Sequence, residues 1–359
     1  MGYTRTMKKI LRSQSIIVPL GAFVCALAGS TGLASSDLES ESRRLSYYEI
    51  CMNPGTDAER ATVEVMNWRA GYDMRTRDER TCKGAADGLK KLHHLKLHRE
   101  PFDPWWELSS LFPVSTIPSL RALSGSHNKF VDLKPLTTLT QLDTLIMWDN
   151  LIEDLTPLSG LKNLRMLLMT KNRIKTIEPL AKLAALKDLS VSENQIADLE
   201  PVRNLRQLDS LAFDANQIES LEPVSGLTRM NYFYAGKNKV RDLRPLSAMQ
   251  AMHLASLGEN EIEDLTGLEN MQVIDALDLH SNKVKDISLL ARLKTLRWLD
   301  LRNNFVEDYS ALAGLRDLKH LYIEGNPSEV LPPEVLGLME EHVNSKGDWI
   351  KLEVDVLKE

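Results

Sequence analysis

The sequence predicts an α/β solenoid, an array of stacked units that each contain one short strand and one short helical turn. An asparagine recurs at every 22nd position, from Asn128 to Asn326. Apolar residues recur at fixed offsets from each asparagine. In six consecutive units, from Pro135 to Pro245, a proline lies seven residues after the asparagine. A period of this length indicates units that bury their apolar faces only against their neighbours.

Each offset from the asparagine has a physical role. Offsets +17 and +19, such as Leu167 and Met169, alternate as in a strand with both side chains directed inward. The asparagine follows the strand, where its short amide can satisfy backbone groups at a sharp bend. The residue at +4 is usually Asp, Ser or Thr and can cap a helical turn that begins near the proline. The side chains at offsets +16, +18 and +20 point outward, and the repeat does not constrain the residue types there.

The unit LxxLxxLxLxxNxIxDLxPL resembles the 22-residue leucine-rich repeat of bacterial internalins and of the regulatory subunits of protein phosphatase 1. The resemblance covers about residues 82–326. It implies a right-handed horseshoe with a parallel β-sheet on the concave side and 3₁₀ or short helical turns on the convex side. We place about 10–11 units in residues 92–326. Residues 327–359 are expected to be a C-terminal cap.

The first 34 residues are expected to be a signal peptide. A basic stretch precedes an apolar run at roughly residues 16–28, and small residues suited to cleavage follow it. The run contains a proline and a glycine and is shorter than a membrane-spanning helix requires, although an uncleaved anchor remains the alternative. We therefore expect an exported bacterial protein that is periplasmic, on the cell surface or secreted. This disfavours the role of the phosphatase regulators, which is cytoplasmic.

Residues 35–91 are expected to form a helical N-terminal cap that closes the end of the array. Helical spacing is present in residues 57–68, where Asp57 can cap the first turn, and again in residues 81–89. An even pair of cysteines in an exported chain, Cys51 and Cys82, indicates one disulfide, worth about 3 kcal/mol on a chain-entropy estimate. Two unrelated free thiols are the alternative.

The charge of the chain limits its partners. The formal net charge is −6, and loss of the four basic residues of the signal peptide makes it about −10. A negative protein is a poor general ligand for nucleic acid or for an anionic membrane surface. After the signal peptide, no segment is apolar enough to span a membrane. We find no phosphate-binding glycine loop and no nucleophile elbow, and we expect no catalytic residue, no cofactor and no metal. The oligomeric state is open.

Candidate binding residues are the outward strand positions, because equal offsets in adjacent units lie ~4.8 Å apart. Three clusters contain aromatic, large apolar or ionisable side chains that are typical of interfaces. The first lies near the C-terminal end: Asp278, His280, Trp298, Asp300, Arg302, His320, Tyr322 and Glu324. The second is apolar: Ile146, Trp148, Met166 and Leu168. The third is Tyr232 and Tyr234, near Asp214. Ordinary solvated strand surface is the alternative for the first cluster, and drift in a family that tolerates surface leucines is the alternative for the second.

The sequence therefore predicts an exported scaffold that binds a macromolecule, most simply a protein, through its concave sheet. Asp278 and Asp300 share one offset on adjacent strands, and a pair of carboxylates could act on a sugar or bind a cation. A glycan-binding or carbohydrate-active envelope protein is thus the alternative function, and a purely structural envelope component is a third. We disfavour catalysis because we expect the concave face to be open, shallow and covered by water.

Overall fold

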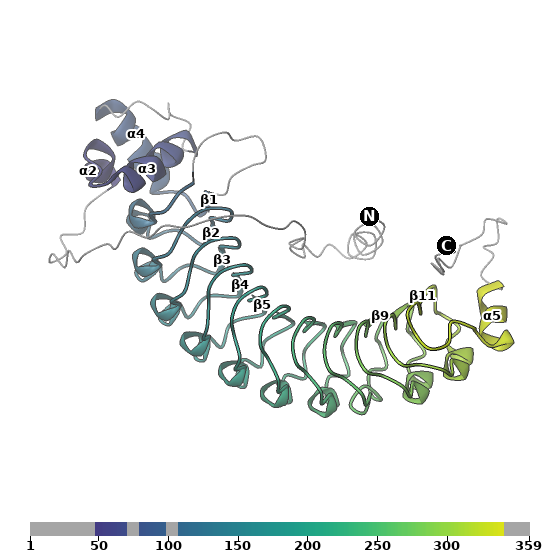
Figure 1. Ribbon diagram of the computed structural model, residues 1–359. Helices are drawn as coiled ribbons and strands as arrows, with labels where there is room; N and C mark the ends of the chain where they lie inside the picture. Colours follow the sequence, from purple (N-terminus) through teal and green to yellow (C-terminus); the bar gives the residue numbers. More distant parts are fainter. Residues whose placement is uncertain (1–46, 70–78, 98–106, 341–359) are drawn as a thin grey trace. The chain divides into compact units, whose positions relative to one another are not determined.

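The computed structural model describes residues 47–69, 79–97 and 107–340, which lie in one compact unit spanning residues 44–359. The expected signal peptide, residues 1–34, lies outside the described residues. Among those described, eleven strands form one parallel sheet in chain order, on the concave side of the array (Figure 1). The strands are β1 (His94–Lys96), β2 (Ala122–Ser124), β3 (Thr144–Ile146), β4 (Met166–Leu168), β5 (Asp188–Ser190), β6 (Ser210–Ala212), β7 (Tyr232–Tyr234), β8 (Leu254–Ser256), β9 (Ala276–Asp278), β10 (Trp298–Asp300) and β11 (His320–Tyr322). The predicted fold class is confirmed.

The strands are in register at the same offset of every unit. Leu145 of β3 pairs with Leu167 of β4, which pairs with Leu189 of β5. These side chains point inward and are buried in one continuous apolar core. Between β1 and β2 the paired residues Leu95 and Leu123 are 28 positions apart, so the six additional residues of the first unit lie outside the sheet.

Each asparagine ties its own unit to the one before it. The Asn150 amide nitrogen donates to Met147 O (3.1 Å) and Trp148 O (3.2 Å) in its own unit, and to Gly125 O (3.0 Å) in the preceding unit. Its amide oxygen accepts the N–H of Phe130 at 3.0 Å, also in the preceding unit. The amides thus bond to backbone rather than to one another, and the ladder holds the stack together through satisfied buried polar groups.

The residue before each asparagine adopts a left-handed backbone. Nine such non-glycine residues have φ between 52° and 58°, from His127 to Asn303, and Gly325 continues the row at 76°. Their side chains include Lys, Glu and Ala, which pay a steric cost at positive φ. The residue types do not predict this conformation, because glycine is absent from all but the last of these positions.

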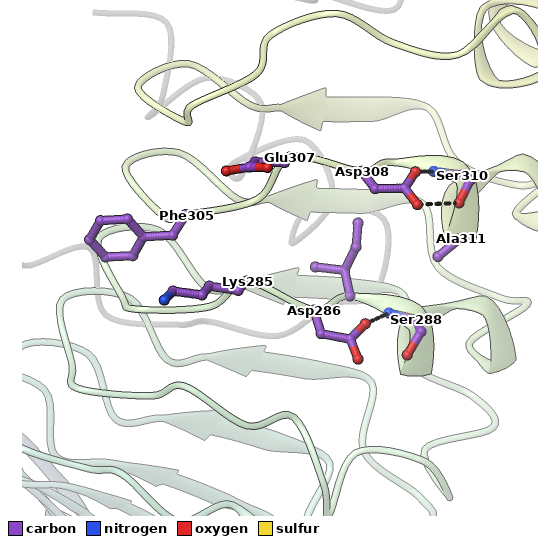
Figure 2. A pocket seen from close by; sticks show the side chains of 9 residues that line it. Lys285, Asp286, Ser288, Phe305, Glu307, Asp308, Ser310 and Ala311 are labelled. Atoms are coloured by element: carbon purple, nitrogen blue, oxygen red, sulfur yellow. Dashed lines mark hydrogen bonds between the residues drawn. The ribbon is translucent and has the colours of Figure 1, made fainter.

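The length of the convex turns differs between the units with the +7 proline and the later units without it. Six proline-containing units each have a three-residue 3₁₀ turn: Lys134–Leu136, Thr156–Leu158, Glu178–Leu180, Glu200–Val202, Glu222–Val224 and Arg244–Leu246. The later turns without proline, Ser288–Arg292 and Ser310–Gly314, are longer, as is the first turn, Phe112–Thr116. The +4 side chain caps as expected: the Asp286 carboxylate accepts the N–H of Ser288, and Asp308 accepts that of Ser310, both at 2.8 Å (Figure 2).

The described part of the expected N-terminal cap contains three helices, α2 (Tyr47–Met52), α3 (Asp57–Arg69) and α4 (Glu79–Leu89). Helix α2 was not expected from the sequence. The predicted cap residue of α3 was wrong: the Thr56 hydroxyl accepts the N–H of Glu59 (3.1 Å) and Glu59 accepts that of Thr56 (3.2 Å), a reciprocal capping box. Asp57 is instead the first helical residue.

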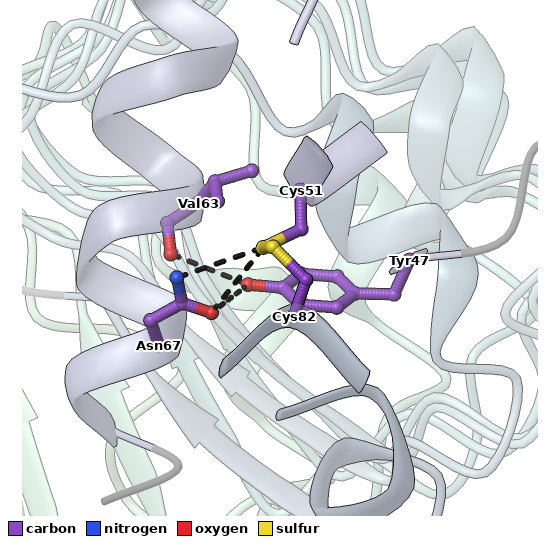
Figure 3. The surroundings of a disulfide bond; sticks show 5 residues. All are labelled: Tyr47, Cys51, Val63, Asn67 and Cys82. Atoms are coloured by element: carbon purple, nitrogen blue, oxygen red, sulfur yellow. Dashed lines mark hydrogen bonds between the residues drawn. A yellow bond between two sulfur atoms is a disulfide. The ribbon is translucent and has the colours of Figure 1, made fainter. Parts of the chain in front are cut away.

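Cys51 and Cys82 form the expected disulfide, which joins α2 to α4 with their Cα atoms 5.6 Å apart (Figure 3). The Tyr47 hydroxyl donates to Asn67 Oδ1 at 3.0 Å beside it, so a buried polar pair accompanies the sulfur atoms. At the other end, α5 (Pro333–Glu340) buries Val335. None of the described helices is both long and apolar enough to cross a membrane.

Candidate functional site

The three predicted clusters occupy separate parts of one face. The apolar cluster lies on β3, β4 and the residues that follow them, the tyrosine pair lies on β7, and the C-terminal cluster lies on and after β9 to β11. The sheet register places Asp278 beside Asp300, Asp300 beside Tyr322, and Ile146 beside Leu168. Members of each cluster are therefore neighbours, and the clusters themselves are not.

The C-terminal cluster differs from the expected open surface. Asp300 is 0% exposed, Trp298 3%, Asp278 5% and Tyr322 8%. The premise that water covers this part of the face was therefore wrong for these four side chains. The Trp298 and Tyr322 rings lie 5.6 Å apart, and Arg302 lies over the Tyr322 ring at 5.3 Å, a cation–π arrangement.

Each buried carboxylate of this cluster has a cationic partner on its own chain segment. Arg302 approaches Asp300 with two guanidinium nitrogens, including Nε at 2.9 Å from Oδ1. His280 Nδ1 lies 2.6 Å from Asp278 Oδ1, and its Nε2 lies 3.5 Å from a Glu259 oxygen. Burial alone lowers the pKa of His280, but the hydrogen bond to Asp278 and the nearby carboxylates outweigh it and hold this pKa above its ordinary value.

Gly258 makes room for the histidine. A Cβ atom at this position would lie 2.1 Å from His280 Nδ1 and 3.1 Å from Asp278 Oδ1. The backbone φ of Gly258 is not in the left-handed region, so space rather than backbone freedom requires glycine here. This role could not be read from the sequence, because it depends on which way the His280 ring turns.

Asp278, His280 and Asp300 are the one group of the described residues with the spacing of metal ligands, their ligand atoms all lying within 4.8 Å of one another. Arg302 compensates the charge of Asp300 internally, and the Asp278 carboxylate is hydrogen-bonded to His280. A general acid and a nucleophile both need a carboxylate that faces its substrate. In this geometry the two carboxylates bind basic side chains of the same chain. The geometry therefore supports the alternative of a carbohydrate-active protein less than the sequence did.

The apolar cluster is more accessible. Ile146, Trp148 and Met166 are partly exposed, and Leu168 is 9% exposed. The Trp148 ring lies 5.1 Å from that of His127. On the adjacent rim, Asp149 bonds to both His127 (2.9 Å) and Lys171 (2.9 Å).

The pKa of Asp149 shows how these rim contacts act. Burial raises it, but the bonds to Lys171 and His127 outweigh burial and lower it overall. The Asp149 carboxylate therefore lies between Lys171 and His127 and bonds to both.

The tyrosine pair lies near Asp214, whose carboxyl group has a raised pKa. Asp214 accepts the Ser192 hydroxyl (3.0 Å) and the N–H of Gly236 (2.9 Å), yet burial raises its pKa to about 6. Burial and the negative charge of Asp214 also raise the pKa of Tyr234. Both tyrosines are partly exposed, so they can contact a ligand on this face.

A pocket of about 380 Å³ lies away from all three clusters (Figure 2). It opens between two units on the turn side and is lined by the exposed Phe305, by Lys285 and Glu307, and by the turn-capping Asp286 and Asp308. The two aspartates already serve the turns, so we assign the pocket no ligand. Sequence reasoning did not identify it.

Comparison with known proteins supports the repeat fold. The family model described as leucine rich repeats (2 copies) matches residues 162–204. No curated protein matches the chain. Among solved structures, an internalin (InlF) from Listeria monocytogenes is 24% identical, with a TM-score of 0.65 over 84% of this chain and 90% of that one.

Two further solved structures share the fold at lower identity. The plant peptide hormone receptor RGFR1 in complex with RGF2 is 22% identical, with a TM-score of 0.56 over 63% of this chain and 39% of that one. The functional domain of InlJ from Listeria monocytogenes is 16% identical, with a TM-score of 0.53 over 67% of this chain and 55% of that one. With the asparagine ladder, the parallel sheet and the 3₁₀ turns, these findings show that the chain has a leucine-rich repeat solenoid fold similar to that of internalins.

Proposed function

We propose that this chain is an exported scaffold that binds a protein partner through its concave sheet, without catalysing a reaction. The observation that carries the proposal is the apolar cluster Ile146, Trp148, Met166 and Leu168 on the outward side of adjacent strands. The 22-residue period accounts for the inward-facing side chains of the strands, but it does not require large apolar residues at these outward positions. Such clusters on a rigid surface are typical of partner sites.

The comparisons add support of a general kind. RGFR1, which shares the fold, is in complex with RGF2. Export rests on the basic and apolar residues at the N-terminus, together with a disulfide, which persists in oxidising compartments. The periplasm, the cell surface and secretion are all compatible with these features.

The glycan alternative has less support. Asp278 and Asp300 lie side by side as that function requires, but they already bind His280 and Arg302 respectively. We therefore place the first contacts of a partner at the apolar cluster and treat the C-terminal cluster as a second contact region of the same face.

The test is site-specific photo-crosslinking in the native envelope or culture medium. A photoreactive residue replaces Trp148 in one variant and Glu178, on a convex turn, in another. We expect one defined crosslinked protein at position 148 and none at 178. Trp148→Glu should abolish capture of that protein, whereas Val131→Glu, which changes an exposed apolar residue off the strands, should not. Crosslinking confined to position 178, or capture that is unchanged by Trp148→Glu, would sink the proposal.

A further inference from the structure

The concave face has an uneven distribution of charge. We count the outward offsets and the rim offset +15 over all eleven strands. From β1 to β5 these positions hold four basic residues, Lys96, Arg121, Arg165 and Lys187, against two acidic ones, Asp143 and Asp188. From β6 to β11 they hold six acidic residues, Asp209, Asp214, Asp275, Asp278, Asp300 and Glu324, against three basic ones, Arg297, Arg302 and Lys319. The chain as a whole is negative, so the positive first half is a local feature.

Two of the three basic residues of the second half have acidic partners. Arg302 is bound by Asp300, and Arg297 lies 3.9 Å from Asp275. Arg121, Arg165 and Lys187 are exposed, and in the part of the chain that the structure describes they form no ion pair. Their charges are therefore available to a ligand.

These free cations border the apolar cluster. Arg165 immediately precedes Met166 of β4, and Arg121 and Lys187 occupy the same offset on the rims of β2 and β5. The rim backbones are in contact, because Arg165 N–H donates to Asp143 O and the N–H of Lys187 donates to Arg165 O, both at 2.8 Å. Three cations, with Asp143 between Arg121 and Arg165, thus line one border of a surface of large apolar side chains.

We propose that this region binds an extended, acidic segment of a protein partner, whose apolar side chains lie over Trp148 and Met166 while its carboxylates meet Arg121, Arg165 and Lys187. The inference rests on the proposed function and specifies the partner chemistry for the same site. Crossing from β2 to β5 spans three strand spacings, ~14 Å, which ~4 extended residues can cover. Apolar contact provides affinity, and the three cations provide orientation and selectivity.

A phosphate-rich ligand fits this region less well. Its charges would lie along the whole ligand, including over the four apolar side chains, and the negative protein would repel it elsewhere. The three unpaired basic side chains lie on one border only, and at the other rim, near Trp148, Lys171 is already paired with Asp149.

The inference is tested by selecting binders from a library of random displayed peptides. The target is the oxidised chain without its expected signal peptide. We expect recovered peptides to combine Asp or Glu with aliphatic or aromatic residues. Their affinity should fall about tenfold in Arg165→Glu and should weaken as salt increases, because exposed charges are screened. The control Arg203→Glu makes the same change of charge on a convex turn and should leave affinity unchanged.

Other outcomes overturn the inference. They are recovery of basic peptides, of neutral peptides, or of none, and equal losses in Arg165→Glu and Arg203→Glu. A selected peptide must also block photo-crosslinking at position 148. If no peptide is selected but a folded protein still crosslinks at 148, the acidic-segment inference fails while the proposed function stands. If the peptides bind as expected but no protein crosslinks at 148, the proposed function fails by itself.

Discussion

The ladder asparagines show how single side chains determine this fold. Asn260 donates to Ala235 O (2.9 Å), Leu257 O (3.0 Å) and Gly258 O (3.2 Å), and accepts Val240 N–H (2.9 Å). No shorter or apolar side chain can make these four bonds. The amide is buried, so backbone groups left without it would not regain water.

We predict that Asn260→Ala lowers the free energy of unfolding by about 3 kcal/mol, because several buried backbone groups lose their partner. Urea unfolding followed by circular dichroism measures this. Asn270→Ala is the matched control: Asn270 is exposed and donates to Ser247 O at 3.2 Å. Equal losses in the two variants would contradict the role of the ladder.

The Asp214 carboxyl should make stability depend on pH. Its pKa is about 6 in the folded protein, above its ordinary value of 3.8, so the folded state binds the proton more tightly. Its ionisation therefore costs stability as the pH rises from about 4 to about 6. Asp214→Asn avoids that cost, and its stability relative to the parent chain should rise by about 2 kcal/mol between pH 4 and pH 7. A relative stability that is the same at both pH values would refute this.

At the scale of elements, the convex turns differ more than the strands. Where Gly267 replaces the proline, the unit between β8 and β9 has no 3₁₀ turn among its described residues. Gly267 has φ 114°, and a Cβ there would lie 2.1 Å from Leu243 O of the preceding unit. Close approach and backbone conformation both require glycine at this point.

Gly267→Ala should therefore destabilise the chain by about 2 kcal/mol or more, from backbone strain and from a clash that only backbone can relieve. Gly226→Ala is the control, because a Cβ at Gly226 meets nothing within 4 Å and its φ is not positive. That variant should stay within about 1 kcal/mol of the parent. Thermal melts of both variants measure the difference, and comparable losses would show that the turn is not specific.

Elements also show what sequence reasoning could and could not predict. The strands and turns followed from the period, and α3 and α4 from helical spacing, because local pattern determines these elements. Helix α2 was missed, since its six residues contain too little pattern and it is held by the Cys51–Cys82 bond and the buried Tyr47. The cap of α3 was placed one residue late, as helix boundaries depend on side-chain geometry.

On the scale of the whole molecule, each unit contacts only its neighbours, so stability should propagate from the ends inward. Helices α2 and α3 contact the first convex turn, Phe112–Thr116, and α5 contacts the last, Ser310–Gly314. A long, repetitive core of this kind can open locally without unfolding entirely.

We predict that replacing both cysteines, Cys51→Ser with Cys82→Ser, costs about 3 kcal/mol. Hydrogen exchange should rise first in α2, α4 and β1, and should leave β5 to β7 protected under the same conditions. The control is the parent chain under reducing conditions, which should behave like the double variant. Exchange that rises uniformly over all strands would show that the array unfolds as one cooperative body.

The sequence by itself determined the repeat, the strand register and the face on which each residue lies, because a fixed period leaves one way to stack the units. It thereby placed Asp278 beside Asp300 and grouped Ile146 with Leu168. The tertiary structure alone decided that His280 and Arg302 bind those carboxylates, that Trp298 is buried, and that the residue before each asparagine takes a positive φ. Side-chain rotamers and contacts between units set these features, and a period carries no information about either.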